Sequence, residues 1–206
     1  MKTFQFLVVF ILFAGLMSCE KEDSGKNEPH GWLLAGSHPK EYIIGIEDQD
    51  AQHGEKSGYI ESVSDTAHGF GTLMQWCVVD SFRGKRLRMT GYVQSLASQT
   101  SYSMMWVRVD DYDKQITADF DNMDDRPLRG TNYWTKCVIV FDVSESTNAV
   151  YYGLILLGPG KAWFDNISFE IVDSSVFKTA YTINQTFVAE LPENFPEGPV
   201  NLDFEE

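Results

Sequence analysis

Short segments of alternating apolar and polar residues recur along this chain, and turn-forming residues separate them. In residues 86–93, Leu87, Met89 and Val93 share one face of an extended backbone, and residues 104–109 alternate in the same way. No long segment repeats its apolar residues with the period of about 3.6 that an amphipathic helix requires. Strands joined by short turns predict an all-β fold, an antiparallel β-sandwich of the jelly-roll type. The expected strands cover residues 73–79, 86–93, 104–109, 137–143, 150–157 and 162–172.

The last part of the chain has a different pattern. Residues 173–199 have few periodic apolar positions and several prolines, so we expect an extended arm there. Alternation returns in residues 200–206, where Val200, Leu202 and Phe204 fall on one side. An isolated strand at a chain end would lose more conformational entropy than it gains. We therefore expect this segment to be a strand that completes a sheet, either in the same chain or in a neighbour.

The beginning of the chain has the pattern of an export signal. An apolar run, residues 6–13, comes after Lys2 and is too short to span a bilayer. The segment 16–19, Leu-Met-Ser-Cys, resembles the lipobox of bacterial lipoproteins. This resemblance implies a signal peptide over residues 1–18, lipidation of Cys19, and a tether over 19–30. A buried N-terminal helix is the alternative, which the charged residues directly after Cys19 disfavour.

The residues after the lipidation site indicate a location. Cys19-Glu20-Lys21-Glu22-Asp23 resembles the export signal of Bacteroidetes lipoproteins that reach the cell surface. The resemblance implies a lipid-anchored protein of the outer membrane, displayed on the cell surface. An anchor facing the periplasm is the alternative. Membrane contact is then expected through the N-terminal lipid only.

The charge of the chain limits its partners. It has 206 residues, 16 Lys and Arg against 30 Asp and Glu, and a formal net charge of −14 at pH 7. Such a chain would repel nucleic acid and anionic lipid headgroups, so neither is an expected ligand. Aromatic residues make up 14% of the sequence, which suits a neutral ligand such as a carbohydrate.

Cysteine and histidine positions indicate little metal or redox chemistry. With Cys19 lipidated, Cys77 and Cys137 remain, and an exported protein could join them in a disulfide. Both lie in apolar runs, which favours two buried free thiols, and this is the interpretation we prefer. The four histidines are scattered and lack the close spacing of a zinc site.

Six segments combine glycine, aromatic and acidic residues in a distinctive order: 31–37, 71–75, 82–86, 120–127, 130–134 and 163–170. Together they resemble the carbohydrate-binding-module-like sandwiches of the galactose-binding type. The most similar variant is found beside AraC-type regulators. The resemblance covers about residues 31–172 plus the terminal strand. It is fairly specific for the fold and weak for the function, since such folds accommodate many ligands.

The resemblance also implies a metal site. Related modules open with a strand of the form Asn-x-x-Phe-Glu, whereas here residues 201–205 carry that pattern at the end of the chain. The terminal strand would then occupy the position of the first strand. Related modules often hold a structural calcium ion nearby, which implies Asp165 and Glu205 as ligands, with carbonyl oxygens of residues 52–57. Ordinary polar residues at strand ends are the alternative.

The candidate ligand-binding residues are aromatic and polar side chains within or beside strands. Sugar rings stack on Trp and Tyr, and amide or charged groups bind their hydroxyls. Gln75 and Arg108 are notable as polar residues in otherwise apolar strands. The predicted binding residues are Trp106, Arg108, Gln75, Trp76, Asn122, Tyr133 and Trp134.

One acidic cluster could serve catalysis. Residues 119–125 contain four aspartates, and glycan hydrolysis uses a pair of carboxylates. Arg126 and Arg129 lie close behind and could neutralise them, and no motif of a nucleophilic or phosphate-binding enzyme is present. We therefore expect no enzyme activity. The predicted function is non-catalytic binding of a carbohydrate or other small ligand. The alternatives are a sensory or protein-interaction module and a glycan hydrolase using this cluster.

Overall fold

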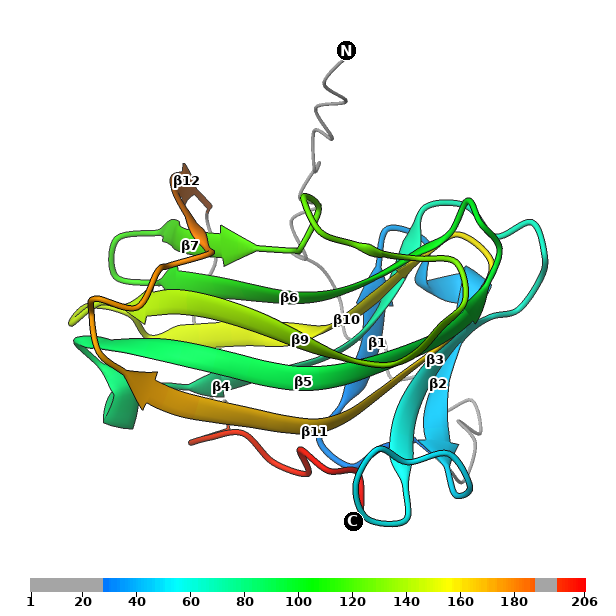
Figure 1. Cartoon of the computed structure of the whole chain (residues 1–206). Coiled ribbons are helices and arrows are strands. Elements are labelled where there is room, and N and C mark those ends of the chain that lie inside the picture. Colours follow the sequence, from blue (N-terminus) through cyan, green and yellow to red (C-terminus); the bar gives the residue numbers. More distant parts are fainter. Residues whose placement is uncertain (1–27, 188–195) are drawn as a thin grey trace.

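The protein is a sandwich of two antiparallel β-sheets, seen in a computed structural model that describes residues 28–187 and 196–206 (Figure 1). The predicted all-β sandwich is confirmed. The predicted signal peptide, Cys19 and most of the tether lie outside the described residues. The described residues contain two short 3₁₀ turns, η1 (Pro39–Glu41) and η2 (Asp80–Phe82), and no α-helix. Within those residues, no helix is long and apolar enough to cross a membrane.

Each sheet is assembled from strands that are distant in sequence. The seven-stranded sheet runs β1 (Leu33–Gly36), β4 (Phe70–Val78), β10 (Ala149–Leu157), β6 (Tyr102–Asp111), β7 (Ile116–Asp121) and β12 (Tyr181–Thr186), and β8 (Leu128–Arg129) pairs with β6. The five-stranded sheet runs β2 (Tyr42–Glu47), β3 (Ser57–Ser62), β11 (Gly160–Val172), β5 (Lys85–Ala97) and β9 (Asn132–Val143).

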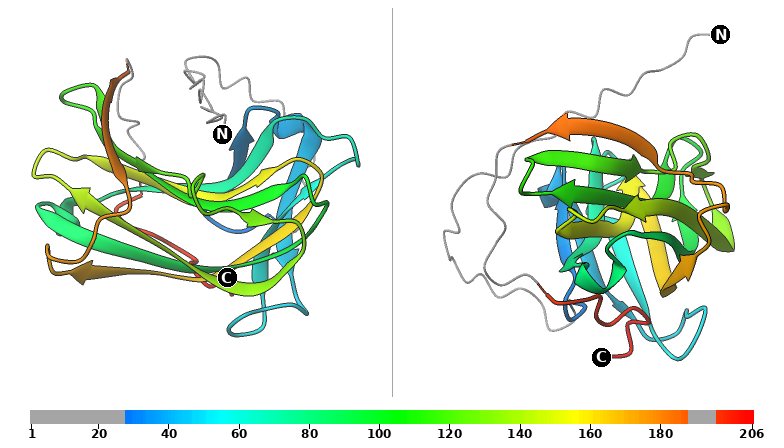
Figure 2. Two further views of the ribbon diagram at one scale, coloured as in Figure 1. Left: turned by 45° about the horizontal axis from the view of Figure 1, so that its top comes forward. Right: turned by 90° about the vertical axis from the view of Figure 1, so that its left-hand side faces the viewer.

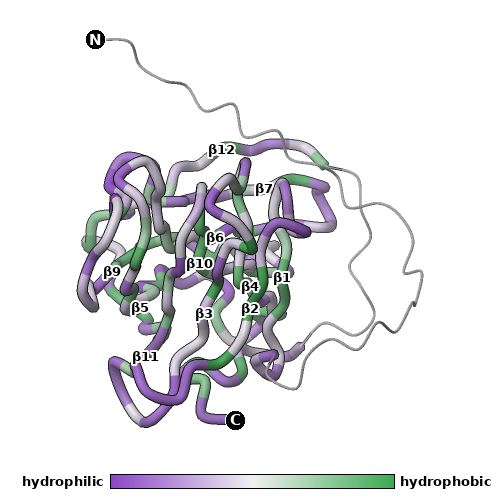
Figure 3. Tube along the Cα trace, turned by 90° about the vertical axis from the view of Figure 1, so that its right-hand side faces the viewer, coloured by the Kyte–Doolittle hydropathy of each residue, from purple (hydrophilic) through white to green (hydrophobic). Residues whose placement is uncertain are grey.

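The core forms between the two sheets because alternate side chains of each strand point inward. Strand β6 contributes Met105 and Val107, β10 contributes Tyr152, and β5 contributes Leu87 and Met89, all with at most 1% exposure. Figure 3 shows hydrophobic colour along the strands and hydrophilic colour along many of the connecting loops. The period of two in the sequence therefore identified the inward-facing positions correctly.

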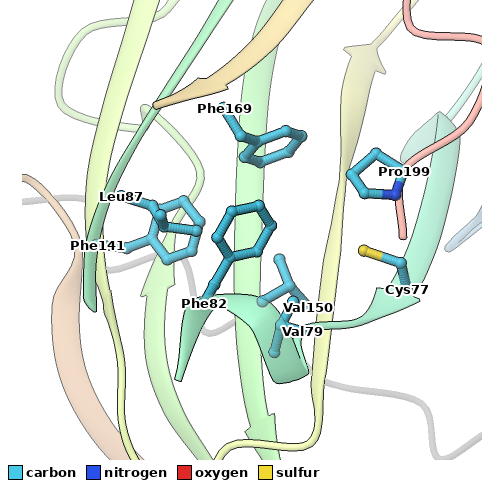
Figure 4. Close-up of a pocket in the computed structure, with 8 residues that line it drawn as sticks. All are labelled: Cys77, Val79, Phe82, Leu87, Phe141, Val150, Phe169 and Pro199. Carbon is cyan, nitrogen blue, oxygen red and sulfur yellow. The ribbon is translucent and has the colours of Figure 1, made fainter. Parts of the chain in front are cut away.

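A gap between the sheets near η2 is too small to hold a ligand (Figure 4). Its volume is about 10 Å³. That volume holds at most about one water molecule. Its lining is apolar throughout: Cys77, Val79, Phe82, Leu87, Phe141, Val150, Phe169 and Pro199.

The two described cysteines are buried free thiols, as preferred from the sequence. Cys77 lies on β4 and Cys137 on β9, in different sheets. Burial raises the pKa of the Cys77 thiol to about 12 and that of Cys137 to about 11. Both thiols therefore stay protonated in the folded protein at any physiological pH.

We expect a thiol reagent such as DTNB to react with neither cysteine of the folded protein near pH 8. The thiolate is the reactive form, and burial removes both the thiolate and access to it. A chain carrying Cys19→Ser should release no coloured thiolate from the reagent when it is native. When it is denatured, it should release two equivalents per chain. Rapid reaction of either thiol in the native protein would contradict this assignment.

The C-terminal segment docks on the sandwich but is not a strand, so that part of the prediction is wrong. Asn201 and Phe204 have positive φ angles of 45° and 57°, which bend the backbone and prevent an extended conformation. Phe204 is fully buried, with its ring centroid 4.9 Å from that of Trp32. Leu202 O accepts a hydrogen bond from Ile167 N at 3.0 Å.

The predicted arm also contains a strand that the sequence pattern did not indicate. Residues 181–186 form β12, which pairs with β7 at the edge of the seven-stranded sheet. Before β12, residues 179 and 180 donate backbone hydrogen bonds to Val140 O on β9. This part of the arm therefore connects the two sheets along one side of the sandwich.

Candidate ligand-binding face

A row of five side chains crosses the outer face of the seven-stranded sheet. The strand register places Trp76 opposite Tyr151, Tyr151 opposite Arg108, Arg108 opposite Phe120, and Phe120 opposite Tyr181. Directly opposed residues of antiparallel strands project to the same face. Their sequence neighbours point inward instead, as the buried Tyr152 beside Tyr151 shows. We call these five residues the cross-strand row.

Close contacts connect the members of the row on β4, β10 and β6. The ring centroids of Trp76 and Tyr151 are 6.2 Å apart. The guanidinium carbon of Arg108 lies 4.2 Å from the centroid of the Tyr151 ring, a cation–π contact. The hydroxyl of Tyr151 is hydrogen-bonded to that of Tyr112, which comes directly after β6. Tyr151 is therefore the central ring of this part of the row.

The positive charge of Arg108 is compensated within the sheet. Arg108 Nη2 lies 2.8 Å from Asp110 Oδ2, and Thr117 Oγ1 donates a 2.8 Å hydrogen bond to Asp110 Oδ1. Burial raises the pKa of Asp110, and the attraction of Arg108 opposes that rise. The face thus presents aromatic rings and hydrogen-bonding groups with no large local net charge.

A second row lies beside the first and supports it. Met74, Gly153 and Trp106 are register partners on β4, β10 and β6. Trp106 is only 7% exposed, and its indole Nε1 donates a 2.9 Å hydrogen bond to Thr72 Oγ1. A Cβ at Gly153 would lie 2.2 Å from Leu73 O, so only glycine fits between these strands. Trp106 therefore packs against the outer surface of the sheet and is nearly buried there.

The sheet that carries these rows is curved. Figure 2 shows β12 and β1 standing at its two edges and rising on the same side. The cross-strand row spans five adjacent strands, and adjacent strands lie about 4.8 Å apart, so the row extends over about 19 Å. The row therefore crosses most of the width of the curved sheet.

Of the seven predicted binding residues, the structure brings three together. Trp76, Trp106 and Arg108 share this outer face. Gln75 points inward, where its Oε1 accepts hydrogen bonds from Tyr152 Oη at 2.5 Å and from Val200 N at 2.8 Å. A buried side-chain amide needs hydrogen-bond partners, and these bonds satisfy it. The bond to Val200 holds the C-terminal segment on the inner side of the sheet, so Gln75 does not contribute to the outer face.

The other three predicted residues lie elsewhere. Tyr133 and Trp134 belong to β9 of the five-stranded sheet; Tyr133 is 92% exposed, and Trp134 Nε1 donates to Asp50 Oδ1 at 3.2 Å. Asn122 comes after β7, and its Oδ1 accepts a 3.3 Å hydrogen bond from Asp124 N in the turn. Sequence reasoning missed Tyr151, Phe120 and Tyr181. The alternation of Tyr151 with core residues was visible, but the strand order that aligns these rings was not.

Two acids of the cluster 119–125, Asp119 and Asp121, have a structural role. Both carboxylate oxygens of Asp119 accept hydrogen bonds from Lys178 Nζ, at 3.0 and 2.8 Å. Asp121 Oδ2 accepts from Arg126 Nη2 at 2.7 Å and from Thr179 Oγ1 at 2.6 Å. These two acids face inward and fasten the segment before β12. They are therefore not positioned to act on a ligand at the outer face.

The two carboxylates that the resemblance implied as calcium ligands accept hydrogen bonds from backbone N–H groups. Asp165 and Glu205 do approach one loop, residues 52–56, as the resemblance implied. The N–H groups of that loop point to the carboxylates: Gln52 N and His53 N each donate to Asp165 Oδ2 at 2.8 Å. Glu55 N donates to Glu205 Oε1 at 2.6 Å, and such hydrogen bonds lower the pKa of Glu205. Positive N–H dipoles around both carboxylates do not fit a calcium ion.

The chain has a relative in sequence among known proteins. No protein-family model matches the chain. It is 36% identical over 197 residues to YbfP of Bacillus subtilis (strain 168), described as an uncharacterised HTH-type transcriptional regulator. The match covers 94% of this chain and 63% of that protein, so the chain spans less than two thirds of its relative.

Solved structures with the same fold include carbohydrate-binding modules and an enzyme. The CBM22-1 xylan-binding domain of Paenibacillus barcinonensis Xyn10C has a TM-score of 0.53 and 14% identity, covering 73% of this chain and 91% of its own. The C-terminal family 22 module of Clostridium thermocellum Xyn10B has a TM-score of 0.52 and 12% identity, with 72% and 89% covered. A Stig cyclase of Fischerella sp. TAU has a TM-score of 0.52 and 13% identity, covering 76% and 93%. At these identities the similarity establishes the fold alone.

Proposed function

We propose that this protein is a non-catalytic binding module that takes a linear carbohydrate on the outer face of its seven-stranded sheet. The observation that carries the proposal is the cross-strand row, in which rings and a guanidinium are aligned over adjacent strands. Sugar rings stack their C–H faces on aromatic side chains, and arginine donates hydrogen bonds to hydroxyls. A face whose arginine is already neutralised by Asp110 suits a neutral sugar better than a charged one.

The structural neighbours support the class of ligand. Two of them are described as xylan-binding or carbohydrate-binding modules of family 22, and they share the sandwich over most of their length. We therefore take β-1,4-linked xylan and related plant glycans as the first ligands to test. The fold also occurs in a cyclase, so the fold alone would not select binding over catalysis.

A second candidate function is ligand sensing. The relative in Bacillus subtilis is described as a transcriptional regulator, and this chain matches 63% of it. A sandwich of this kind could bind a sugar and report it to an attached domain. Both functions use the same binding face, and they differ in the consequence of binding.

The location remains part of the proposal. We propose that Cys19 is lipidated and that the module is held at the outer membrane, facing the cell surface. The supporting observation is the sequence around Cys19. Labelling of cells with a radioactive fatty acid, compared between the natural chain and Cys19→Ser, tests the lipidation. Surface proteolysis tests the orientation.

Glycan-array binding of the Cys19→Ser chain tests the function. We expect selective binding to linear β-linked glycans, and a weaker signal in Trp76→Ala, because this change removes the ring at one end of the row. Tyr133→Ala is the matched control, since Tyr133 is 92% exposed on the five-stranded sheet. A folded protein that binds no glycan, or equal binding by Trp76→Ala, would count against the proposal.

A further inference from the structure

Strand β12 adds little to the core of the sandwich. All six of its residues are exposed, and it lies at the edge of the seven-stranded sheet beyond β7. Its pairing with β7 is interrupted by a register shift between Thr182 and Gln185. The buried apolar area that usually retains a strand is thus small here. A further interaction adds to this pairing and holds β12 in place.

That interaction is a polar clamp around Asp119, which is only 4% exposed. Lys178 Nζ lies within 3.0 Å of both Asp119 carboxylate oxygens, and Thr182 Oγ1 donates to Asp119 Oδ1 at 2.8 Å. Lys178 Nζ also donates to Thr182 Oγ1 at 2.8 Å, which closes the triangle. Hydrogen bonds that involve charged groups are the stronger kind, and here they satisfy a buried carboxylate.

The clamp fixes the position of one aromatic side chain. Tyr181 directly precedes Thr182 and is the register partner of Phe120. Because Thr182 points inward to the clamp, Tyr181 projects to the opposite, outer face, where it is 55% exposed. It forms the end of the cross-strand row that lies farthest from Trp76.

We infer that Tyr181 provides the last subsite of the binding face, so that the protein selects carbohydrate chains by length. The inference rests on the proposed function. A short oligosaccharide would occupy the row from Trp76 to Arg108 only. A longer chain would continue over Phe120 and gain the contact with Tyr181. Lys178 is then a positioning residue, which acts on the ligand through Tyr181.

The expected gain in affinity from Tyr181 is that of a single aromatic contact. Aromatic contacts contribute about 0.5–1.5 kcal/mol beyond their buried area, which corresponds to about a two- to twelvefold change in affinity. That gain should appear only for chains long enough to reach Tyr181. Dependence on chain length therefore distinguishes this role from a general effect on folding.

The test is calorimetric titration of the full chain carrying Cys19→Ser with xylo-oligosaccharides of two to six residues. We expect affinity to rise with the length of the oligosaccharide. In Tyr181→Ala, the gain in affinity for the longest oligosaccharides should be absent. Lys178→Met should reduce the same gain, and its thermal unfolding would confirm that the sandwich is intact. Phe177→Ala is the matched control, because Phe177 is 83% exposed on the same segment but lies outside the row.

The outcomes separate the inference from the proposed function. If binding is weakened in Trp76→Ala but Tyr181→Ala binds every length as the parent does, the length selection is wrong and the binding face stands. An equal loss at all lengths in Tyr181→Ala would also overturn the inference. If the parent chain binds no oligosaccharide of the series, nor the corresponding cello-oligosaccharides, both the inference and the proposed function fail.

Discussion

Phe204→Ala is expected to lower the free energy of unfolding by about 3–5 kcal/mol, the usual cost of removing a buried phenylalanine. The ring is fully buried between Trp32 and Phe164, with centroid distances of 4.9 and 6.5 Å. It also covers Gly58, where a Cβ would lie 2.2 Å from the Phe204 ring. Removing the ring leaves a cavity at the end of the core that the neighbouring rings cannot fill.

The loss should extend beyond this one side chain. In the same segment, Asn201 O accepts a 2.9 Å hydrogen bond from Trp32 Nε1. Val200 N donates a hydrogen bond to Gln75 Oε1. Urea unfolding monitored by fluorescence measures the change. Asp203→Ala is the control, since Asp203 is exposed in the same segment. If Phe204→Ala is no less stable than this control, the segment does not dock as described.

Tyr151→Ala is expected to weaken carbohydrate binding by about 30-fold, the effect of losing about 2 kcal/mol at a binding hot spot. Tyr151 is the central ring of the row, in contact with Trp76 on one side and with the Arg108 guanidinium on the other. Its removal takes away a stacking surface and also removes the cation–π contact that helps to position Arg108, leaving the ion pair with Asp110. Both effects act on the ligand, so the loss should exceed that of a terminal ring.

Tyr151→Phe separates the ring from its hydroxyl. This change keeps the contacts with Trp76 and Arg108 and removes only the hydrogen bond to Tyr112, so we expect affinity within about threefold of the parent. Isothermal titration with the best ligand from the array measures both variants. Full affinity in Tyr151→Ala would place the binding site elsewhere on the molecule.

The sequence was sufficient for the fold class because its signal is local. Alternation at Leu87 and Met89 gives the inward face of a strand without knowledge of any partner strand. The same argument correctly predicted buried thiols at Cys77 and Cys137. These predictions depend on periodicity and on the burial of apolar groups alone.

The binding face could be predicted only in part, because it depends on register between distant strands. Trp76 and Arg108 were selected by residue type, but Tyr151 joins them only through the pairing of β10 with β4 and β6. Tyr181 lies on a strand with no buried residue, so its segment lacks the apolar alternation by which strands are recognised.

The C-terminal segment illustrates a different limit. Alternation of Val200, Leu202 and Phe204 suggested a strand, yet Asn201 and Phe204 adopt positive φ. The apolar residues are still buried or partly buried. The backbone that carries them forms a turn, which hydrogen bonds with Trp32 and Gln75 hold in place. Periodicity therefore predicted which residues contact the core. It did not predict the backbone conformation that brings them into contact.

The most direct test of the binding face is a crystal structure of the protein with the oligosaccharide that binds it most tightly. We predict sugar rings over Trp76 and Tyr151, with the chain running across the strands toward Tyr181 and a hydroxyl bonded to Arg108. A ligand bound to the outer face of the five-stranded sheet near Trp134, or in the loops around Pro159, would contradict this prediction.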